Sequence, residues 1–80
     1  MLAYGYPRNS ESDYPEQLQE ASLLCTKEEL DRIIEFLQNL QSKSSSFESV
    51  TGIHAHFRDY DKCWNASSSD FIICLRDEET

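Results

Sequence analysis

The chain has 80 residues, of which 39% are hydrophobic and 28% charged, and fifteen acidic against seven basic residues give it a formal net charge of −8. This length fits a single domain, residues 1–80, with a thin hydrophobic core. The acidity argues against direct binding to DNA, RNA or anionic membranes, because their phosphates would repel the chain. The apolar and aromatic content is too high for a disordered acidic tail.

The sequence also bears on the compartment. The N-terminal residues lack the basic stretch and apolar run of a secretory signal, and no window has the length and hydrophobicity of a membrane-spanning helix. The cysteines, Cys25, Cys63 and Cys74, are odd in number and their spacing fits neither a disulfide framework nor a zinc motif. We therefore expect a cytoplasmic protein with reduced cysteines.

The clearest predicted element is a helix over residues 27–42. Thr26 and Glu29 have the spacing of a capping box, in which each residue binds a free backbone N–H of the other. Apolar residues then recur every three or four positions, as in Leu30, Ile33, Ile34, Leu37 and Leu40. The serines of residues 42–46 indicate the end of the helix, and one of its faces must be buried.

Strands are predicted on both sides of this helix. Alternating or continuous apolar residues indicate strands over 18–25, 50–58 and 70–76, and residues 59–69 form a connector. Residues 1–17 are expected to hold an N-terminal strand and a loop. The predicted fold class is α+β, a two-layer ββαββ arrangement with one amphipathic helix packed on a mostly antiparallel sheet of three or four strands.

His54 and His56 are the most suggestive polar pair. Residues two positions apart in a strand project from the same face, so the two imidazoles could share a metal ion. Asp59, Asp61 and Cys63 follow closely, but none is a dependable third ligand, and we predict no cofactor. The alternatives are two half-solvated histidines on the sheet face, or two polar rings at a partner surface, which we favour.

Catalytic patterns are sparse. Cys63 beside His54 or His56 would make a thiol–imidazole pair, but nothing in the sequence supplies an oxyanion site for it. The sequence contains no nucleophile elbow and no phosphate-binding loop. We therefore predict that the protein is not an enzyme.

The aromatic residues point instead to binding. The chain has four tyrosines, four phenylalanines and one tryptophan, and the core is expected to take Phe36, Phe57, Phe71 and one tyrosine. The remaining aromatic side chains should lie among polar ones, as in binding hot spots, unless Trp64 folds back over the strand at 70–76. The predicted partner-binding residues are His54, His56, Arg58, Asp59, Tyr60, Asp61 and Trp64.

Several segments carry a family resemblance, namely Leu24–Leu30, His54–Tyr60, Trp64 and Ser69–Ile73. Together they resemble small acidic bacterial immunity proteins of polymorphic toxin systems, including contact-dependent inhibition. The resemblance implies a cytoplasmic protein that binds one cognate toxin domain with a basic surface and blocks it. The serine-rich segment 42–46 departs from the more acidic segment expected there.

Two other hypotheses remain open at this point. One is a metal- or ligand-binding module centred on His54 and His56. The other is a structural homodimer that pairs an exposed strand, because a small sheet leaves edges that invite pairing.

Overall fold

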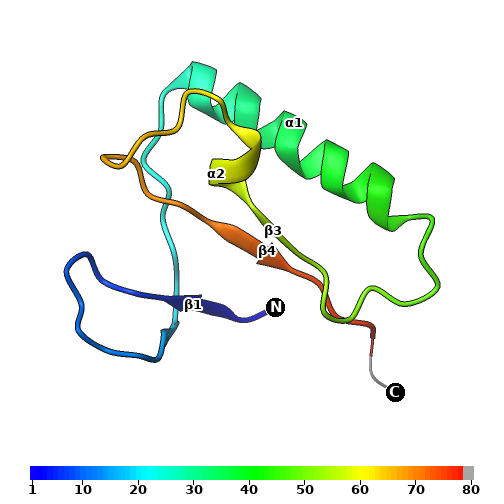
Figure 1. The fold of residues 1–80 in the computed structure, drawn as a ribbon, viewed down its shortest axis with the longest axis horizontal. Helices are drawn as coiled ribbons and strands as arrows, with labels where there is room; N and C mark the ends of the chain where they lie inside the picture. Colours follow the sequence, from blue (N-terminus) through cyan, green and yellow to red (C-terminus); the bar gives the residue numbers. More distant parts are fainter. Residues whose placement is uncertain (79–80) are drawn as a thin grey trace.

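The computed structural model describes residues 1–78 and has an α+β fold, as predicted (Figure 1). One long helix lies along one side of a β-hairpin, and a second hairpin at the N-terminus lies apart from both. No helix in the described part of the chain combines the length and hydrophobicity needed to cross a membrane. The elements, in chain order, are β1 (Ala3–Gly5), β2 (Glu16–Leu18), α1 (Lys27–Ser44), β3 (His54–His56), α2 (Phe57–Tyr60) and β4 (Ile72–Cys74).

The strands form two separate antiparallel pairs rather than the single sheet of three or four strands that we predicted. β1 pairs with β2, and β3 pairs with β4. The strand predicted over 18–25 is wrong beyond Leu18, because residues 19–25 have no neighbouring strand and are exposed. Pairing of Gly5 with Glu16 and of Ala3 with Leu18 instead places the second strand earlier in the chain.

α1 begins where the capping box predicts. The Glu29 N–H donates to Thr26 Oγ1 at 3.1 Å, and the Thr26 N–H donates to Glu29 Oε1 at 2.9 Å. The helix continues two residues past the predicted end, to Ser44. The serine hydroxyls there bond back to carbonyls of the preceding turn, as Ser44 Oγ does to Gln41 O, and the helix ends inside the predicted serine segment, with Ser45 as its C-cap.

The strands predicted over 50–58 and 70–76 are present but shorter. Gly52 has a φ of +91°, in the left-handed region, which interrupts an extended strand before β3. After β3 the chain turns into α2, because the Asp61 N–H donates to Phe57 O and not to a neighbouring strand. The connector predicted over 59–69 therefore begins inside this one-turn helix.

The core is a cluster of four aromatic rings, made of the three predicted phenylalanines and of Tyr60, which was predicted at the partner-binding surface instead. Phe36 of α1 and Phe57 of α2 are 4% and 7% exposed. The Phe36 ring lies 5.5 Å from the rings of Phe57 and Phe71 and 5.6 Å from that of Tyr60, and Phe57 stacks on Phe71 at 4.9 Å. These edge-to-face and stacked pairs join α1 to both ends of the β3–β4 connection.

Asp77 closes the other end of the β3–β4 hairpin. Its carboxylate accepts hydrogen bonds from the hydroxyl of Ser49, from the Val50 N–H at 3.0 Å and from the hydroxyl of Thr51 at 2.7 Å. These bonds stabilise the ionised carboxylate and lower the pKa of Asp77 from 3.8 to about 2. The loop after α1 is thereby tied to the segment after β4.

We expect Phe36→Ala to destabilise the fold strongly. Removing a buried phenylalanine ring costs about 3–5 kcal/mol, which is most of the stability of a small domain. Phe47 is exposed, so Phe47→Ala should change the unfolding free energy by less than about 0.5 kcal/mol. Urea titration followed by the fluorescence of Trp64 measures both, and equal losses would contradict a core centred on Phe36.

The low pKa of Asp77 predicts a pH-dependent contribution to stability. A carboxylate whose pKa falls on folding stabilises the folded state fully above its unfolded pKa, here 3.8, and loses this effect as the pH falls through about 2. The stability difference between wild type and Asp77→Asn should therefore be largest above pH 3.8 and shrink toward pH 2. Thermal unfolding across this range tests it, and a difference that is constant with pH would contradict the prediction.

Candidate functional site

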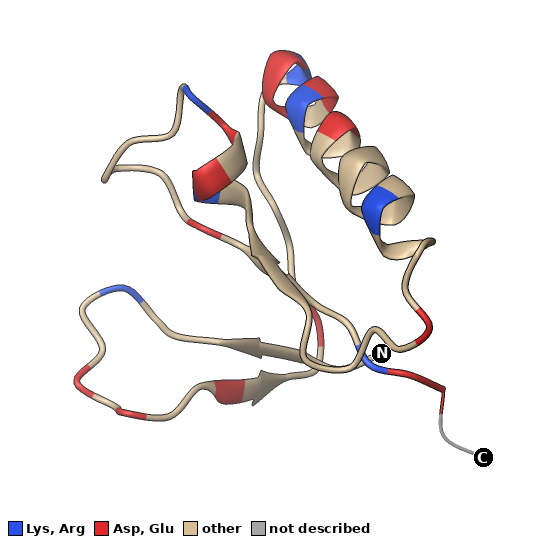
Figure 2. Ribbon diagram, turned by 45° about the vertical axis from the view of Figure 1, so that its right-hand side comes forward, with Lys and Arg blue, Asp and Glu red and all other residues tan. Residues whose placement is uncertain are grey.

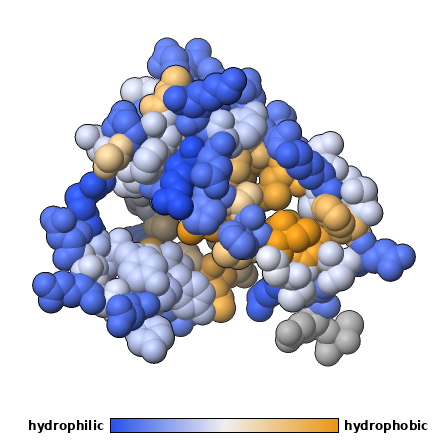
Figure 3. Space-filling model, in the orientation of Figure 1, coloured by the Kyte–Doolittle hydropathy of each residue, from blue (hydrophilic) through white to orange (hydrophobic). Residues whose placement is uncertain are grey.

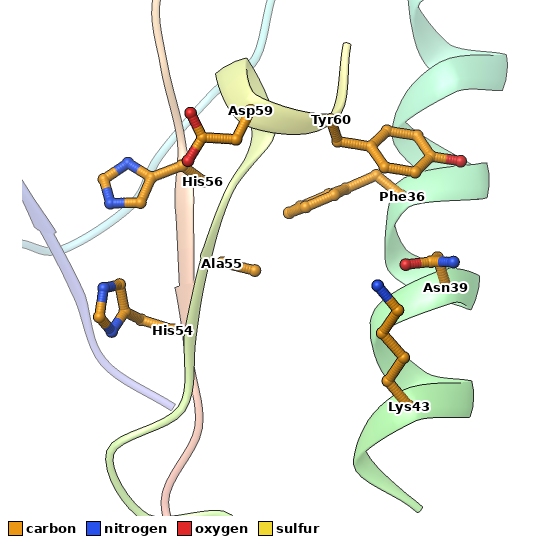
Figure 4. A pocket seen from close by; sticks show the side chains of 8 residues that line it. All are labelled: Phe36, Asn39, Lys43, His54, Ala55, His56, Asp59 and Tyr60. Carbon is orange, nitrogen blue, oxygen red and sulfur yellow. The ribbon is translucent and has the colours of Figure 1, made fainter.

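The two histidines of β3 project from the face of the hairpin that is turned away from α1 (Figure 4). Their ring centroids lie 5.7 Å apart at an interplanar angle of 75°. His54 is exposed and His56 is partly buried. The spacing of two residues in a strand thus places both rings on one face, as predicted.

Asp70 fixes the inner histidine and the start of α2. Its carboxylate lies 2.8 Å from His56 Nδ1 and accepts the backbone N–H of Arg58 at 2.9 Å. Partial burial raises the pKa of Asp70, but the bonds from His56 and Arg58 outweigh it and hold the pKa below its usual value. Sequence reasoning missed Asp70, because only the β3–β4 pairing brings it beside residues twelve and fourteen positions earlier.

Asp61 lies in the interior of the protein, next to α1. It is 8% exposed, its Oδ1 lies 3.0 Å from Arg32 Nε of α1, and the same atom accepts the N–H of Cys63 at 3.0 Å. Asp61 was predicted at the partner-binding surface, whereas the structure uses its carboxylate to hold the connector against α1. Arg32 was not predicted, since its position in the helix pattern resembles that of any solvated basic residue.

Tyr60 and Trp64 also have structural contacts. Tyr60 packs on Phe36 and keeps part of its ring exposed. The indole N–H of Trp64 donates to Ser69 O at 3.1 Å, a hydrogen bond between two residues of the connector. Ile72 and Cys74 remain exposed, so the alternative in which Trp64 covers this strand does not describe the fold.

The exposed residues of the predicted set are His54, Arg58, Asp59 and Tyr60, and we call these four residues the α2 surface. Beside it, an open depression of about 310 Å³ lies between β3 and α1 (Figure 4). Asn39 and Lys43 of α1 line its far side. Such a shallow, open depression suits contact with a macromolecule better than enclosure of a small ligand.

The two chemical alternatives gain little from this geometry. Within residues 1–78 no three histidine, cysteine or acidic side chains are arranged to hold a metal ion. Cys63 lines a second depression together with Arg32, Glu35 and Lys62, and neither histidine is part of that lining. The structure therefore does not bring together the thiol–imidazole pair considered from the sequence.

Comparison with known proteins adds no relative: no family model, no curated protein and no solved structure matches this chain. The site must therefore be interpreted from its own geometry.

We expect the Arg32–Asp61 pair to matter more for folding than its exposed neighbours. Asp61→Asn keeps the shape of the side chain but leaves the Arg32 guanidinium without its counter-charge, and should lower the melting temperature by several degrees. Asp59→Asn removes the same charge two positions earlier, where the side chain is 74% exposed, and should leave it nearly unchanged. Equal effects of the two variants would show that Asp61 has no special structural role.

Proposed function

We propose that this protein is a cytoplasmic immunity protein that binds and neutralises a cognate toxin domain with a basic surface, as its resemblance to such proteins suggests. It acts by stoichiometric binding and not by catalysis. The proposed contact area is the α2 surface, which consists of His54, Arg58, Asp59 and Tyr60. His56 contacts Asp70, which in turn holds the start of α2.

The observation that carries this proposal is the anchoring of α2 on three sides. Phe57 inserts into the aromatic core, Asp70 accepts the N–H of Arg58 and contacts His56, and Asp61 binds Arg32 directly after the helix. A four-residue helix would not hold its shape alone. Held in this way, the backbone of α2 loses little conformational entropy on binding, which favours affinity.

Charge supports a basic partner. Acidic residues occur in both hairpins, in the first half of α1 and in α2 (Figure 2). With a net charge of −8 on 80 residues, the whole molecule attracts a basic cleft over long distances and accelerates association at low salt. A toxin that acts on nucleic acid would present such a cleft.

The proposal predicts a charge effect confined to the α2 surface. Asp59→Lys should slow association with the toxin domain encoded by the neighbouring gene by about tenfold at low salt, and less at high salt because ions screen the interaction. Asp13→Lys makes the same change of charge in the N-terminal hairpin, where the residue is exposed, and should act only through net charge. Stopped-flow or surface plasmon resonance kinetics at two salt concentrations measure both.

Two results would contradict the proposal. If no protein product of the neighbouring genes binds the wild-type chain, it is not an immunity protein for them. If the toxin binds but Asp13→Lys slows association as much as Asp59→Lys, the α2 surface is not the contact area.

A further inference from the structure

α1 leaves half of its apolar face uncovered. The helix buries Phe36 and partly buries Ile33 and Leu40 against the hairpin. Leu30, Ile34 and Leu37, which belong to the same predicted apolar stripe, are 46%, 44% and 40% exposed. We call these three residues the α1 flank.

The α1 flank faces away from β3. Asn39 and Lys43 of α1 line the depression beside β3 (Figure 4). At 100° per residue, Leu37 and Asn39 project to opposite sides of Phe36, which points at the hairpin. The α1 flank therefore lies on the side of α1 opposite to the one that faces β3, turned about 100° to 160° from Phe36, and the side that faces β3 carries polar residues.

The outer edge of β4 is unpaired. Phe57 N donates to Phe71 O and Leu75 N to Ile53 O, so the odd-numbered residues bond across the hairpin. The backbone groups of Ile72 and Cys74 then point outward from β4, because alternate residues of a strand bond to opposite sides. Within the described residues, β4 has no neighbour but β3.

The area of the molecule is large for its mass. The described chain exposes 7227 Å², whereas a compact protein of 9.3 kDa exposes about 5,000 Å². The radius of gyration of 14.0 Å likewise exceeds the value of about 12 Å expected for 80 residues. Hydrophobic side chains reach the surface near the middle of the molecule (Figure 3).

The charges on α1 do not oppose self-association here. Glu28 and Glu35 lie on the side of the helix away from the α1 flank, by the same rotation of 100° per residue, whereas Asp31, three residues before Ile34, lies at the margin of the flank. The flank itself consists of leucine and isoleucine. Two copies can therefore bring their flanks together while most of their negative charge stays apart.

We propose that two copies of this chain associate through β4 and the α1 flank. A two-fold axis beside β4 would pair it antiparallel with its own copy, which joins the two hairpins into one four-stranded sheet and brings the two α1 flanks into contact. We choose a second copy of this chain as the partner, because a single two-fold axis would both pair the unpaired edges of β4 and bring the two α1 flanks together. The interface leaves the α2 surface free and does not depend on the proposed function.

Sedimentation equilibrium of the full chain under reducing conditions, over micromolar concentrations, tests the association. The wild type should sediment as a dimer. Leu37→Glu places a charge in the flank and should weaken the dimer at least tenfold. Asn39→Glu, two positions away on the β3 side, should leave the dimer constant within twofold.

Amide hydrogen exchange of the wild type identifies the edge without any substitution. Exchange at Ile72 and Cys74 should slow as the concentration rises, while exchange at His54 and His56, on the outer edge of β3, should not change. A chain that stays monomeric at all concentrations overturns the proposal and leaves the flank to a different partner. A dimer that protects the β3 edge, or that Leu37→Glu does not weaken, overturns it as well.

Discussion

The packing of Phe36 between Phe57 and Phe71 is the interaction on which this structure depends. Each β-hairpin has only three-residue strands, and such a pair is not stable alone in water. α1 likewise has an apolar face that needs a partner. The aromatic cluster stabilises the β3–β4 hairpin and also packs against the apolar face of α1. It lies at the end of this hairpin where α2 begins. The order of α2, and with it the proposed contact area, follows from the burial of these rings.

The molecule thus separates two kinds of surface. On one side, Asp70 and Asp61 hold α2 and the connector in place, and the charged side chains of α2 face solvent. On the other side, α1 exposes leucine and isoleucine side chains, and within the described residues β4 pairs with no strand but β3. A binding protein that is also a dimer would present its polar contact areas twice, on outward sides of one assembly, without either contact blocking the other.

The sequence predicted the parts that local patterns determine. The capping box of Thr26 and Glu29 and the apolar spacing placed α1 correctly, and burial of Phe36 and Phe57, with partial burial of Phe71, followed from the limited size of the core. The end of the strand predicted over 18–25 could not be placed correctly from the sequence. An alternating pattern of apolar residues does not show whether another strand lies beside it to pair with. Asp70 and Asp77 were missed for a related reason: their roles arise from the pairing of β3 with β4, which places each carboxylate beside residues far away in the chain.

The N-terminal hairpin has a different relation to the rest of the chain. Residues 19–25 separate it from α1, and a side-chain bond of 3.4 Å from Arg8 to Ser67 O links its loop to the connector. Its tyrosines take no part in the aromatic cluster. The hairpin lies apart from the aromatic core, so we expect it to open locally at a lower cost in free energy than the core. Because Tyr60 belongs to the aromatic cluster, tyrosine signals report on both parts of the chain, whereas the Trp64 signal reports on the connector beside the core. If the hairpin opens first, one midpoint does not describe the unfolding of the whole chain.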